Sequence, residues 1–239
     1  PYRTHPAGIP SDIESYRLSD ALEFRKTYYV PSNIIIGIAG DVDPKDVKLM
    51  AEKYFGKMKG GPKPTGIMTK ENPQQGEKRL VVETASQPIV AIGYKRPNVL
   101  DPDDTVLDVL AAVLGTGRTS LLNKEIVEDK KIALAAIAQS GFPGNRRENL
   151  FLFFAVPNAG KTTEDCEKAI YEIIERVKKD PVSEAELKRV KTILRAGIIR
   201  GLDSNTGMAQ NLVINKDLFG DWRMLFQQID ALAKILSLI

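Results

Sequence analysis

The hydrophobic and polar positions of this chain change period several times, and each change marks an expected element. Residues 33–40 form a continuous apolar run rich in isoleucine, which is typical of an interior strand. Residues 44–55 carry apolar positions at helical spacing, with Asp43 as N-cap, Pro44 at the first helical position and Gly56 as the stop. The stripe that this expected helix buries consists of Val47, Ala51, Tyr54 and Phe55.

The rest of the chain alternates between the two periods. A further helix is expected at residues 19–29, and Pro31 ends it. Strands are expected at residues 79–84, 89–95, 132–139 and 150–156, and helices at residues 101–114, 119–129, 165–179 and 183–200. Ser183 and Glu186 form a capping box at the start of the last of these helices. Residues 201–207 break it, and more helix follows.

These elements predict an α+β fold with a mixed, mostly antiparallel sheet and helices packed on one face. Residues 57–76 are rich in Gly, Pro, Lys and Thr and read as an exposed linker, either between two layers of one fold or between two small lobes. We expect residues 1–30 to be a connecting segment with a helix from a preceding subdomain, and residues 31–239 to form the main α+β subdomain.

Composition excludes several classes of protein. The net charge is +3 with both signs interspersed, which gives no electrostatic footprint for nucleic acid or an acidic membrane surface. No apolar run approaches the roughly 18 residues of a membrane span. The single cysteine, Cys166, lies on an apolar helical stripe and reads as a packed thiol; it leaves the redox compartment open. The compartment is not fixed by the sequence, and both the bacterial periplasm and the cytoplasm agree with it.

The sequence offers no metal or catalytic site of its own. A zinc site needs three or four converging ligands, whereas this chain has one histidine, His5, and one cysteine. Neither H-E-x-x-H nor its inverted form occurs, and nothing near His5 resembles a nucleophile elbow. The carboxylate pairs at residues 103–104 and 164–165 fall at helix starts, where the helix dipole favours acidic residues. We therefore expect no catalytic, metal or cofactor-binding residue, and the substrate-binding residues stay unknown.

Two glycine-containing turns are weaker candidates for ligand binding. Residues 155–162, AVPNAGKT, loosely fit a phosphate loop, but Pro157 removes a backbone donor and no later strand supplies an Asp for the metal. Residues 115–120, GTGRTS, lie between two expected helices and not after a strand, which disfavours a dinucleotide fingerprint. Nucleotide binding is thus the weakest of the function classes considered.

The order of several motifs resembles the insulinase/pitrilysin family of zinc metallopeptidases, which includes the mitochondrial processing peptidases. The motifs, none of them diagnostic alone, are PYRTHP at 1–6, IPSDI at 9–13, GDVDP at 40–44, EKYFG at 52–56, the turn and helix start GTGRTSLL at 115–122, IVEDKKIA at 126–133 and SEAELKRVK at 183–191. Together they cover nearly the whole chain and resemble the C-terminal subdomain of one half of such a peptidase.

The resemblance implies a zinc endopeptidase whose two halves enclose an unfolded peptide, with H-x-x-E-H in one half and its Glu as general base. Those residues precede the matched region, so zinc is expected in the longer protein and not in this chain. The implied partners are a metal-bearing subdomain upstream and a second half-molecule or subunit. Many substrate-gripping halves carry an Arg and a Tyr at positions that here are Val127 and Leu134. This departure favours either a metal-bearing half or a degenerate subunit.

Two hypotheses from different classes follow. In the first, the chain is a non-catalytic subdomain of a zinc endopeptidase, part of the peptide-enclosing chamber and inactive alone. In the second, the longer protein never held a metal and serves as a scaffold or partner of an active subunit. The chain starts at Pro1 and its last residues read as an open helix, from which we expect a piece of a longer protein.

Overall fold

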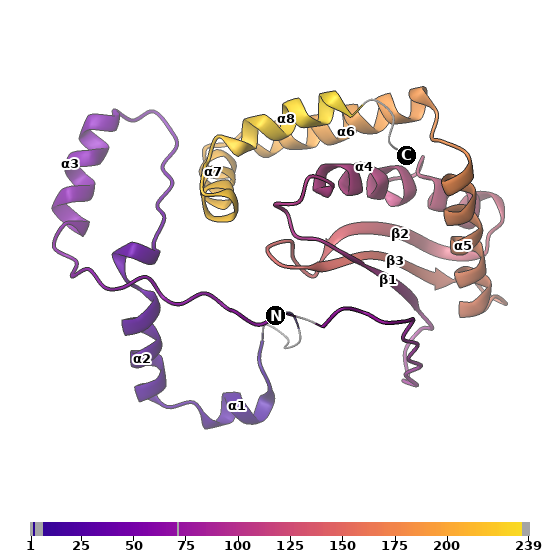
Figure 1. Cartoon of the computed structure of the whole chain (residues 1–239), viewed down its shortest axis with the longest axis horizontal. Helices are drawn as coiled ribbons and strands as arrows, with labels where there is room; N and C mark the ends of the chain where they lie inside the picture. The colour runs from indigo at the N-terminus through magenta and orange to yellow at the C-terminus, as the bar shows by residue number, and fades with distance from the viewer. Residues whose placement is uncertain (1, 3–6, 71, 236–239) are drawn as a thin grey trace. The chain divides into compact units, whose positions relative to one another are not determined.

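The chain folds into two structural units (Figure 1), as given by a computed structural model that describes residues 2, 7–70 and 72–235. Unit 1 comprises Pro1–Glu77 and Leu202–Trp222, and unit 2 comprises Lys78–Gly201 and Arg223–Ile239. The first boundary falls just after the expected linker, residues 57–76. The expected division at residues 30–31 concerns subdomains of a longer protein and stays a prediction.

Unit 2 is built on a three-stranded antiparallel sheet. Its strands are β1 (Val90–Arg96), β2 (Ala133–Phe142) and β3 (Asn149–Pro157), in the order β1-β3-β2. Alternate residues of β3 are buried, because successive side chains of a strand point to opposite faces. The strands expected at 89–95, 132–139 and 150–156 are confirmed, and the α+β class with them.

Helices cover one face of this sheet. Helix α4 (Asp104–Gly115) contacts β2, and α5 (Thr163–Lys179) contacts β3 and β1. A short π-helix, η2 (Asn123–Asp129), contacts β2, while α6 (Glu184–Gly201) and α8 (Met224–Lys234) pack against α4 (Figure 1). The main core lies between sheet and helices and includes Leu122, Ile126, Phe153 and Ile170. A second cluster, with Val109, Val113 and Val190, joins α4 to α6.

The approach of α4 to the sheet requires a glycine. A Cβ added at Gly115 would lie 1.8 Å from the backbone nitrogen of Ala138 on β2. No side chain fits at that separation, so the end of α4 lies directly against β2. The start of α5 carries a complete capping box, and the one expected at the start of α6 forms in half. Thr162 and Asp165 make the full reciprocal box on α5. At α6, Ser183 accepts from the amide of Glu186 at 3.2 Å.

Unit 1 consists of α1 (Pro10–Ser15), α2 (Leu18–Tyr28), the 3₁₀ turn η1 (Pro31–Asn33), α3 (Pro44–Phe55) and α7 (Asn205–Phe219). The extended segment after η1 lies against α7. A Cβ added at Gly37 would meet Val213 Cγ2 at 2.5 Å and the carbonyl oxygen of Ala209 at 2.9 Å. Glycine at this position therefore allows α7, which comes late in the chain, to pack against the segment that follows η1 in unit 1.

Three sequence expectations are wrong in the structure. Residues 34–39 are not in a strand, and the isoleucines among them are 41–53% exposed. Residues 79–84 are also outside any strand, with Leu80 84% exposed. Helix α3 has its expected bounds, but its stripe is not buried, since Tyr54 is 66% and Phe55 51% exposed. The physical reason is shared: periodicity identifies a surface that prefers burial, whereas burial itself needs a second surface, and the described residues leave these side chains at least 41% exposed.

Candidate functional site

No metal centre forms among the residues that the structure describes. In that part of the chain, no three His, Cys, Asp or Glu side chains gather in a way that could hold an ion. His5 lies outside the described residues. Cys166 is buried in α5, its Sγ donates to the carbonyl of Ile132 at 3.8 Å, and burial raises the pKa of the thiol. A protonated, enclosed thiol is a poor nucleophile and a poor metal ligand.

The loop that resembles a phosphate loop is organised as a helix cap. The amide of Asp165 donates to Thr162 Oγ1 at 3.1 Å, and the amide of Thr162 donates to Asp165 Oδ2 at 3.0 Å. Asn158 holds the loop to the preceding turn by donating to the carbonyl of Lys131 at 3.1 Å. The Asp165 carboxylate thus occupies the N-terminus of α5, where an anion would have to bind.

The second glycine turn is likewise structural. Ser120 is fully buried, and its hydroxyl donates to the carbonyl of Gly117 at 2.7 Å. Gly117 has a φ of +79°, which a side chain rarely adopts. The turn therefore connects the end of α4, where Gly115 lies against β2, to η2, which also contacts β2.

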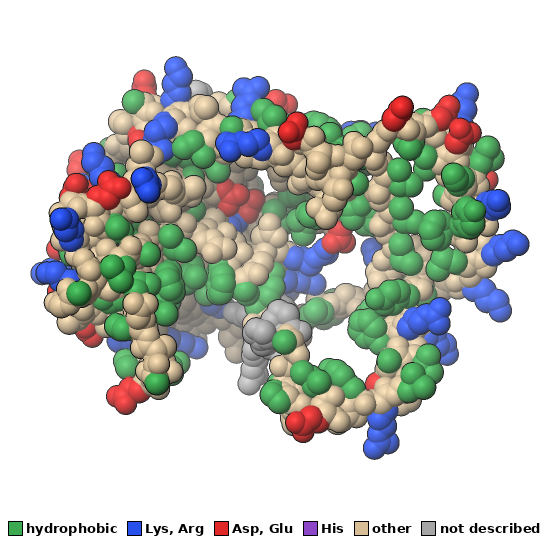
Figure 2. Space-filling view, turned by 180° about the vertical axis from the view of Figure 1, so that it is seen from behind, with side chains coloured by type: hydrophobic (Ala, Val, Ile, Leu, Met, Phe, Trp, Pro, Cys, Tyr) green, Lys and Arg blue, Asp and Glu red, His purple; other side chains and the backbone are tan. Residues whose placement is uncertain are grey.

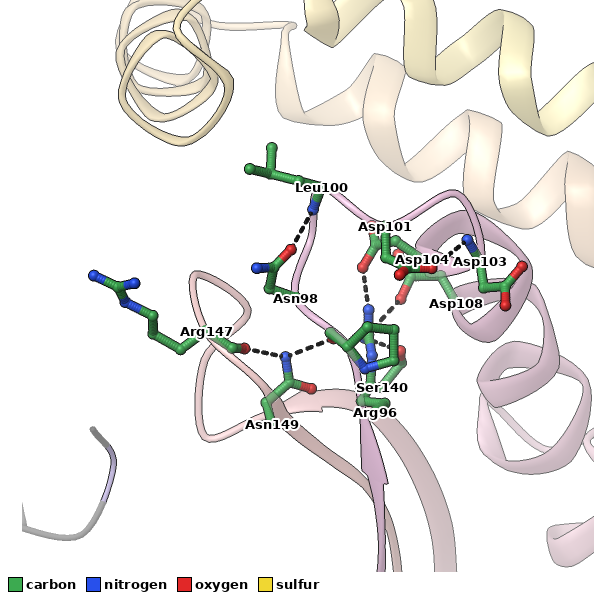
Figure 3. A network of polar contacts seen from close by, with 11 residues as sticks. Arg96, Asn98, Leu100, Asp101, Asp103, Asp104, Asp108, Ser140, Arg147 and Asn149 are labelled. Carbon is green, nitrogen blue, oxygen red and sulfur yellow. Dashed lines mark hydrogen bonds and ion pairs between the residues drawn. The ribbon is translucent and has the colours of Figure 1, made fainter. Parts of the chain in front are cut away.

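The most concentrated polar chemistry surrounds Arg96, at the end of β1 (Figure 3). Arg96 is 4% exposed. Its guanidinium donates to Asp104 on α4 and to Ser140 on β2, and its Nη1 lies 3.7 Å from Asp108 Oδ1, one helical turn after Asp104. We call these four residues the Arg96 cluster. It joins three elements of unit 2 through one buried cation.

The electrostatics of the Arg96 cluster are unbalanced, because two carboxylates share one guanidinium. Burial raises the pKa of Asp104 above its usual value, and the neighbouring Asp108 charge raises it further, against the attraction of Arg96. Burial also raises the pKa of Asp108, opposed by hydrogen bonding to Ser140 and by Arg96. Arginine stays charged in proteins, so the cation of the cluster persists, whereas the ionised form of both carboxyl groups is disfavoured.

Backbone-directed bonds extend the network into the neighbouring loops (Figure 3). Asn149 Nδ2 donates to the carbonyl of Arg147 at 2.8 Å and to that of Pro97 at 3.3 Å. The amide of Val99 donates to the carbonyl of Asn145 at 2.9 Å. The connection from β1 to α4 is thereby fixed to the β2–β3 loop. The network therefore fixes β1, α4 and β2 relative to one another.

Sequence reasoning missed this cluster. Asp104 was interpreted as an acidic residue that the dipole at a helix start favours. That agrees with its place as the first residue of α4 but overlooks its partner, Arg96. The available signal was an Arg at the end of an apolar strand followed by acidic residues at positions 104 and 108, one helical turn apart. Nothing in that pattern states that all three side chains face one another.

Val127 and Leu134, the two positions that the sequence analysis considered for contact with a substrate, are both apolar. Val127, on η2, is partly buried against the main core of unit 2. Leu134, on β2, is 54% exposed. Neither side chain can hydrogen-bond or carry charge, so these two positions offer no polar grip on a peptide.

Unit 1 carries a large exposed apolar surface. Figure 2 shows hydrophobic side chains spread over the part of the molecule formed by α2 and α3. We define the apolar surface of unit 1 by the large hydrophobic residues that are 41–75% exposed in α2, the segment 34–38 and α3: Leu18, Leu22, Phe24, Tyr28, Ile34, Ile35, Ile36, Ile38, Leu49, Met50, Tyr54 and Phe55. Soluble monomers rarely leave so many large side chains uncovered together.

A family model described as the Peptidase M16 inactive domain matches residues 16–194 of the chain. This chain belongs to the M16 peptidase family. M16 is the insulinase/pitrilysin family that the motif order resembles, so the recognition from sequence is confirmed. The matched region is the inactive domain of the family, in agreement with the lack of a metal cluster among the described residues.

Individual relatives agree with the assignment to the M16 family. The chain is 32% identical over 228 residues to the zinc protease PqqE of Helicobacter pylori, covering 92% of this chain and 51% of that protein. It is 24% identical to a probable mitochondrial-processing peptidase subunit beta of Arabidopsis thaliana, covering 86% and 40%. The crystal structure of a protease from Helicobacter pylori superposes with a TM-score of 0.86 at 30% identity, covering 97% of this chain and 56% of the other.

The chain therefore spans about half the length of the relatives it matches. None of the helices in residues 2, 7–70 and 72–235 combines the length and the apolar content that a membrane crossing demands.

Proposed function

We propose that this chain is the non-catalytic C-terminal part of a longer zinc-dependent endopeptidase of the M16 family. In that protein it forms part of the wall of a peptide-enclosing chamber and holds the metal-bearing subdomain through unit 1. The observation that carries the proposal is the apolar surface of unit 1, because a surface of this kind requires a partner.

The energetics of covering that surface support the proposal. Burying one large hydrophobic side chain contributes about 1.5–3 kcal/mol, and roughly half as much where the side chain is already half buried. Covering only a few of the twelve residues therefore contributes several kcal/mol, enough to hold two subdomains of one chain together. The apolar segment 34–39 adds extended backbone outside any strand, which suits pairing with the edge of a sheet in the covering subdomain.

The zinc belongs to the partner subdomain in this proposal. Relatives are named zinc proteases, and the inactive domain described here has no ligand cluster among its described residues. The metal would activate a water for attack on the peptide bond, with ligands supplied from outside this chain. The chain's own contribution is to enclose the substrate. The sheet face away from the helices suits that task, since it presents Ile137, 43% exposed, beside the partly exposed Leu152 and Phe154.

A second candidate function is a scaffold or partner subunit of an active peptidase, with no metal in either part of the longer protein. The apolar pair Val127 and Leu134 favours such a degenerate subunit as much as it favours a metal-bearing half, because neither side chain can hydrogen-bond to a peptide. The mitochondrial-processing peptidase relative is named as a subunit.

The test uses the whole protein purified from its natural source. Its zinc content and its cleavage of a quenched fluorescent peptide are measured with and without chelator. We expect about one zinc per protein and cleavage that the chelator abolishes and added zinc restores. Absence of both zinc and cleavage in the intact protein would refute the peptidase proposal in favour of the partner subunit.

Docking through unit 1 has a separate test. Ile36→Lys places a charge on the apolar surface of unit 1, and Ile199→Lys is its matched control on unit 2, since the two isoleucines are 53% and 52% exposed. We expect Ile36→Lys to lower the melting temperature and raise the trypsin sensitivity of the whole protein, and Ile199→Lys to leave both unchanged. Equal effects of the two variants would show that unit 1 is not covered.

A further inference from the structure

A short apolar segment at the start of unit 2 has the composition of a strand but pairs with none in the described structure. Residues 79–84, RLVVET, follow the linker and lead through residues 85–89 into β1 (Figure 1). Leu80, Val81 and Val82 are 84%, 82% and 70% exposed, among the most exposed large hydrophobic side chains that the structure describes. Residues 80–84, which we call segment 80–84, form no backbone hydrogen bond with other described residues.

The apolar run in this segment is typical of a strand that is covered on both faces. Successive side chains of a strand point to opposite faces, so Val81 would lie on one face and Leu80 and Val82 on the other. A strand with one face in water carries polar residues on that face, whereas a strand covered on both faces is apolar throughout. Valine and threonine also favour strands over other structures. Segment 80–84 therefore suits a sheet that a further layer covers.

Segment 80–84 is held to unit 2 on both sides. Before it, both Nη atoms of Arg79 donate to the Glu167 carboxylate on α5, at 2.8 and 2.6 Å. After it, only residues 85–89 separate the segment from β1. The segment is therefore presented from a restricted place on unit 2, and a partner that pairs with it is attached to unit 2.

The partner that suits this segment is a permanent one. Exposed apolar strands pair readily with other molecules, and natural proteins protect them with charged residues, proline, bulges or a cover. Residues 80–82 carry neither charge nor proline, so we expect a cover. A peptide substrate would provide one only while bound. The matched part is 51% of the Helicobacter pylori zinc protease and 56% of the superposed crystal structure, so these relatives contain nearly as much chain again.

We propose that segment 80–84 pairs as a β-strand with the edge of a sheet in the metal-bearing subdomain of the longer protein, which covers Leu80, Val81 and Val82. Addition of an extended segment to an open sheet edge is a common mode of recognition. This pairing rests on the proposed function, which supplies the subdomain. It adds unit 2 as a second point of attachment besides the apolar surface of unit 1.

Hydrogen exchange followed by mass spectrometry tests the pairing. Peptides that contain residues 80–84 are compared between this chain alone and the whole protein. We expect exchange near the unprotected rate in the chain alone and exchange slowed by at least about a hundredfold in the whole protein. Fast exchange in both would overturn the proposal. Protection already present in the chain alone would overturn it in favour of pairing with β1 or, if sedimentation velocity shows a dimer, with a second copy.

A matched pair of variants tests the cover independently of the backbone. Val81→Lys and Met68→Lys change residues that are 82% and 83% exposed, both outside any helix or strand. In the whole protein we expect Val81→Lys to lower the melting temperature by about 5 °C or more and Met68→Lys to leave it unchanged. In this chain alone neither variant should change it, because both side chains lie in water. Equal melting temperatures of the two variants in the whole protein would contradict the cover.

The outcomes separate this pairing from the proposed function. If Ile36→Lys lowers the melting temperature of the whole protein and Val81→Lys does not, docking through unit 1 stands and pairing of segment 80–84 is refuted. The zinc and cleavage assay concerns the peptidase alone and does not depend on the segment. Protection of residues 80–84 that appears only when an uncleaved peptide is added would assign the segment to substrate binding and would also refute the pairing.

Discussion

Arg96 is the buried residue on which we expect the fold of unit 2 to depend most. Replacement by methionine keeps much of the aliphatic stem but removes the cation shared by Asp104 and Asp108. The Asp104 side chain is 14% exposed, so it would be left charged and poorly solvated, whereas Asp108, at 51%, can turn to water. Removing one partner of a buried ion pair costs about 3–5 kcal/mol. Because Asp104 can escape by protonation, we expect the lower end, about 3 kcal/mol.

The assay is urea unfolding of the intact chain, followed by circular dichroism, while the fluorescence of Trp222 reports separately on unit 1. Arg96→Met should move the midpoint to lower urea without changing the slope of the transition that reports unit 2. Lys178→Met is the control: it breaks the exposed pair with Glu175, whose side chains are 63% and 58% exposed, and should give no measurable change.

A double variant separates the lost ion pair from lost packing. If the cost of Arg96→Met comes from stranding Asp104, then Arg96→Met/Asp104→Asn should be less destabilised than the sum of the two single variants. Additive costs, or an Arg96→Met effect no larger than that of the control, would refute the electrostatic account of the cluster.

Three other positions give direct predictions. Gly115→Ala should destabilise unit 2 by about 3 kcal/mol or more in thermal unfolding, because the new Cβ would meet the Ala138 backbone at 1.8 Å; Gly197→Ala in α6, where nothing lies within 4 Å, should instead stabilise by about 0.5–1 kcal/mol. Partial burial raises the pKa of the Asp108 carboxyl, so the protonated form favours the fold. This stabilisation is complete below the unfolded-state pKa of about 3.8 and is lost as pH rises through the higher folded-state pKa. Asp108→Asn should therefore raise the unfolding free energy at pH 7 by less than about 1 kcal/mol and have no advantage at pH 3. Cys166, buried and with a raised thiol pKa, should react with a thiol reagent only at the rate of unfolding; fast reaction in the native chain would contradict its burial.

Local signals predicted most of unit 2. Caps, periodicity and glycine stops located α4, α5 and α6 within a few residues, because each such signal acts on backbone groups within one or two turns. Three strands were also predicted, since their partners lie in the same unit and their alternation or apolar character is strong. The family followed from the order of short motifs along the chain, and the family model bears it out.

The sites were less predictable, because they depend on which surfaces meet. The sequence shows Arg96, Asp104 and Asp108, but only the packing of α4 against the sheet places both carboxyls at one guanidinium.

The sequence by itself determined where the backbone turns helical or extended, the family, and the lack of a metal motif in this chain. Only the tertiary structure decided what is buried. The isoleucines of residues 34–39 and the apolar positions of α3 have the spacing of buried residues, yet their large side chains are 41–66% exposed in the described structure. A hydrophobic pattern is a property of one segment, whereas burial is a property of two surfaces in contact. The sequence of the segment does not specify the second surface.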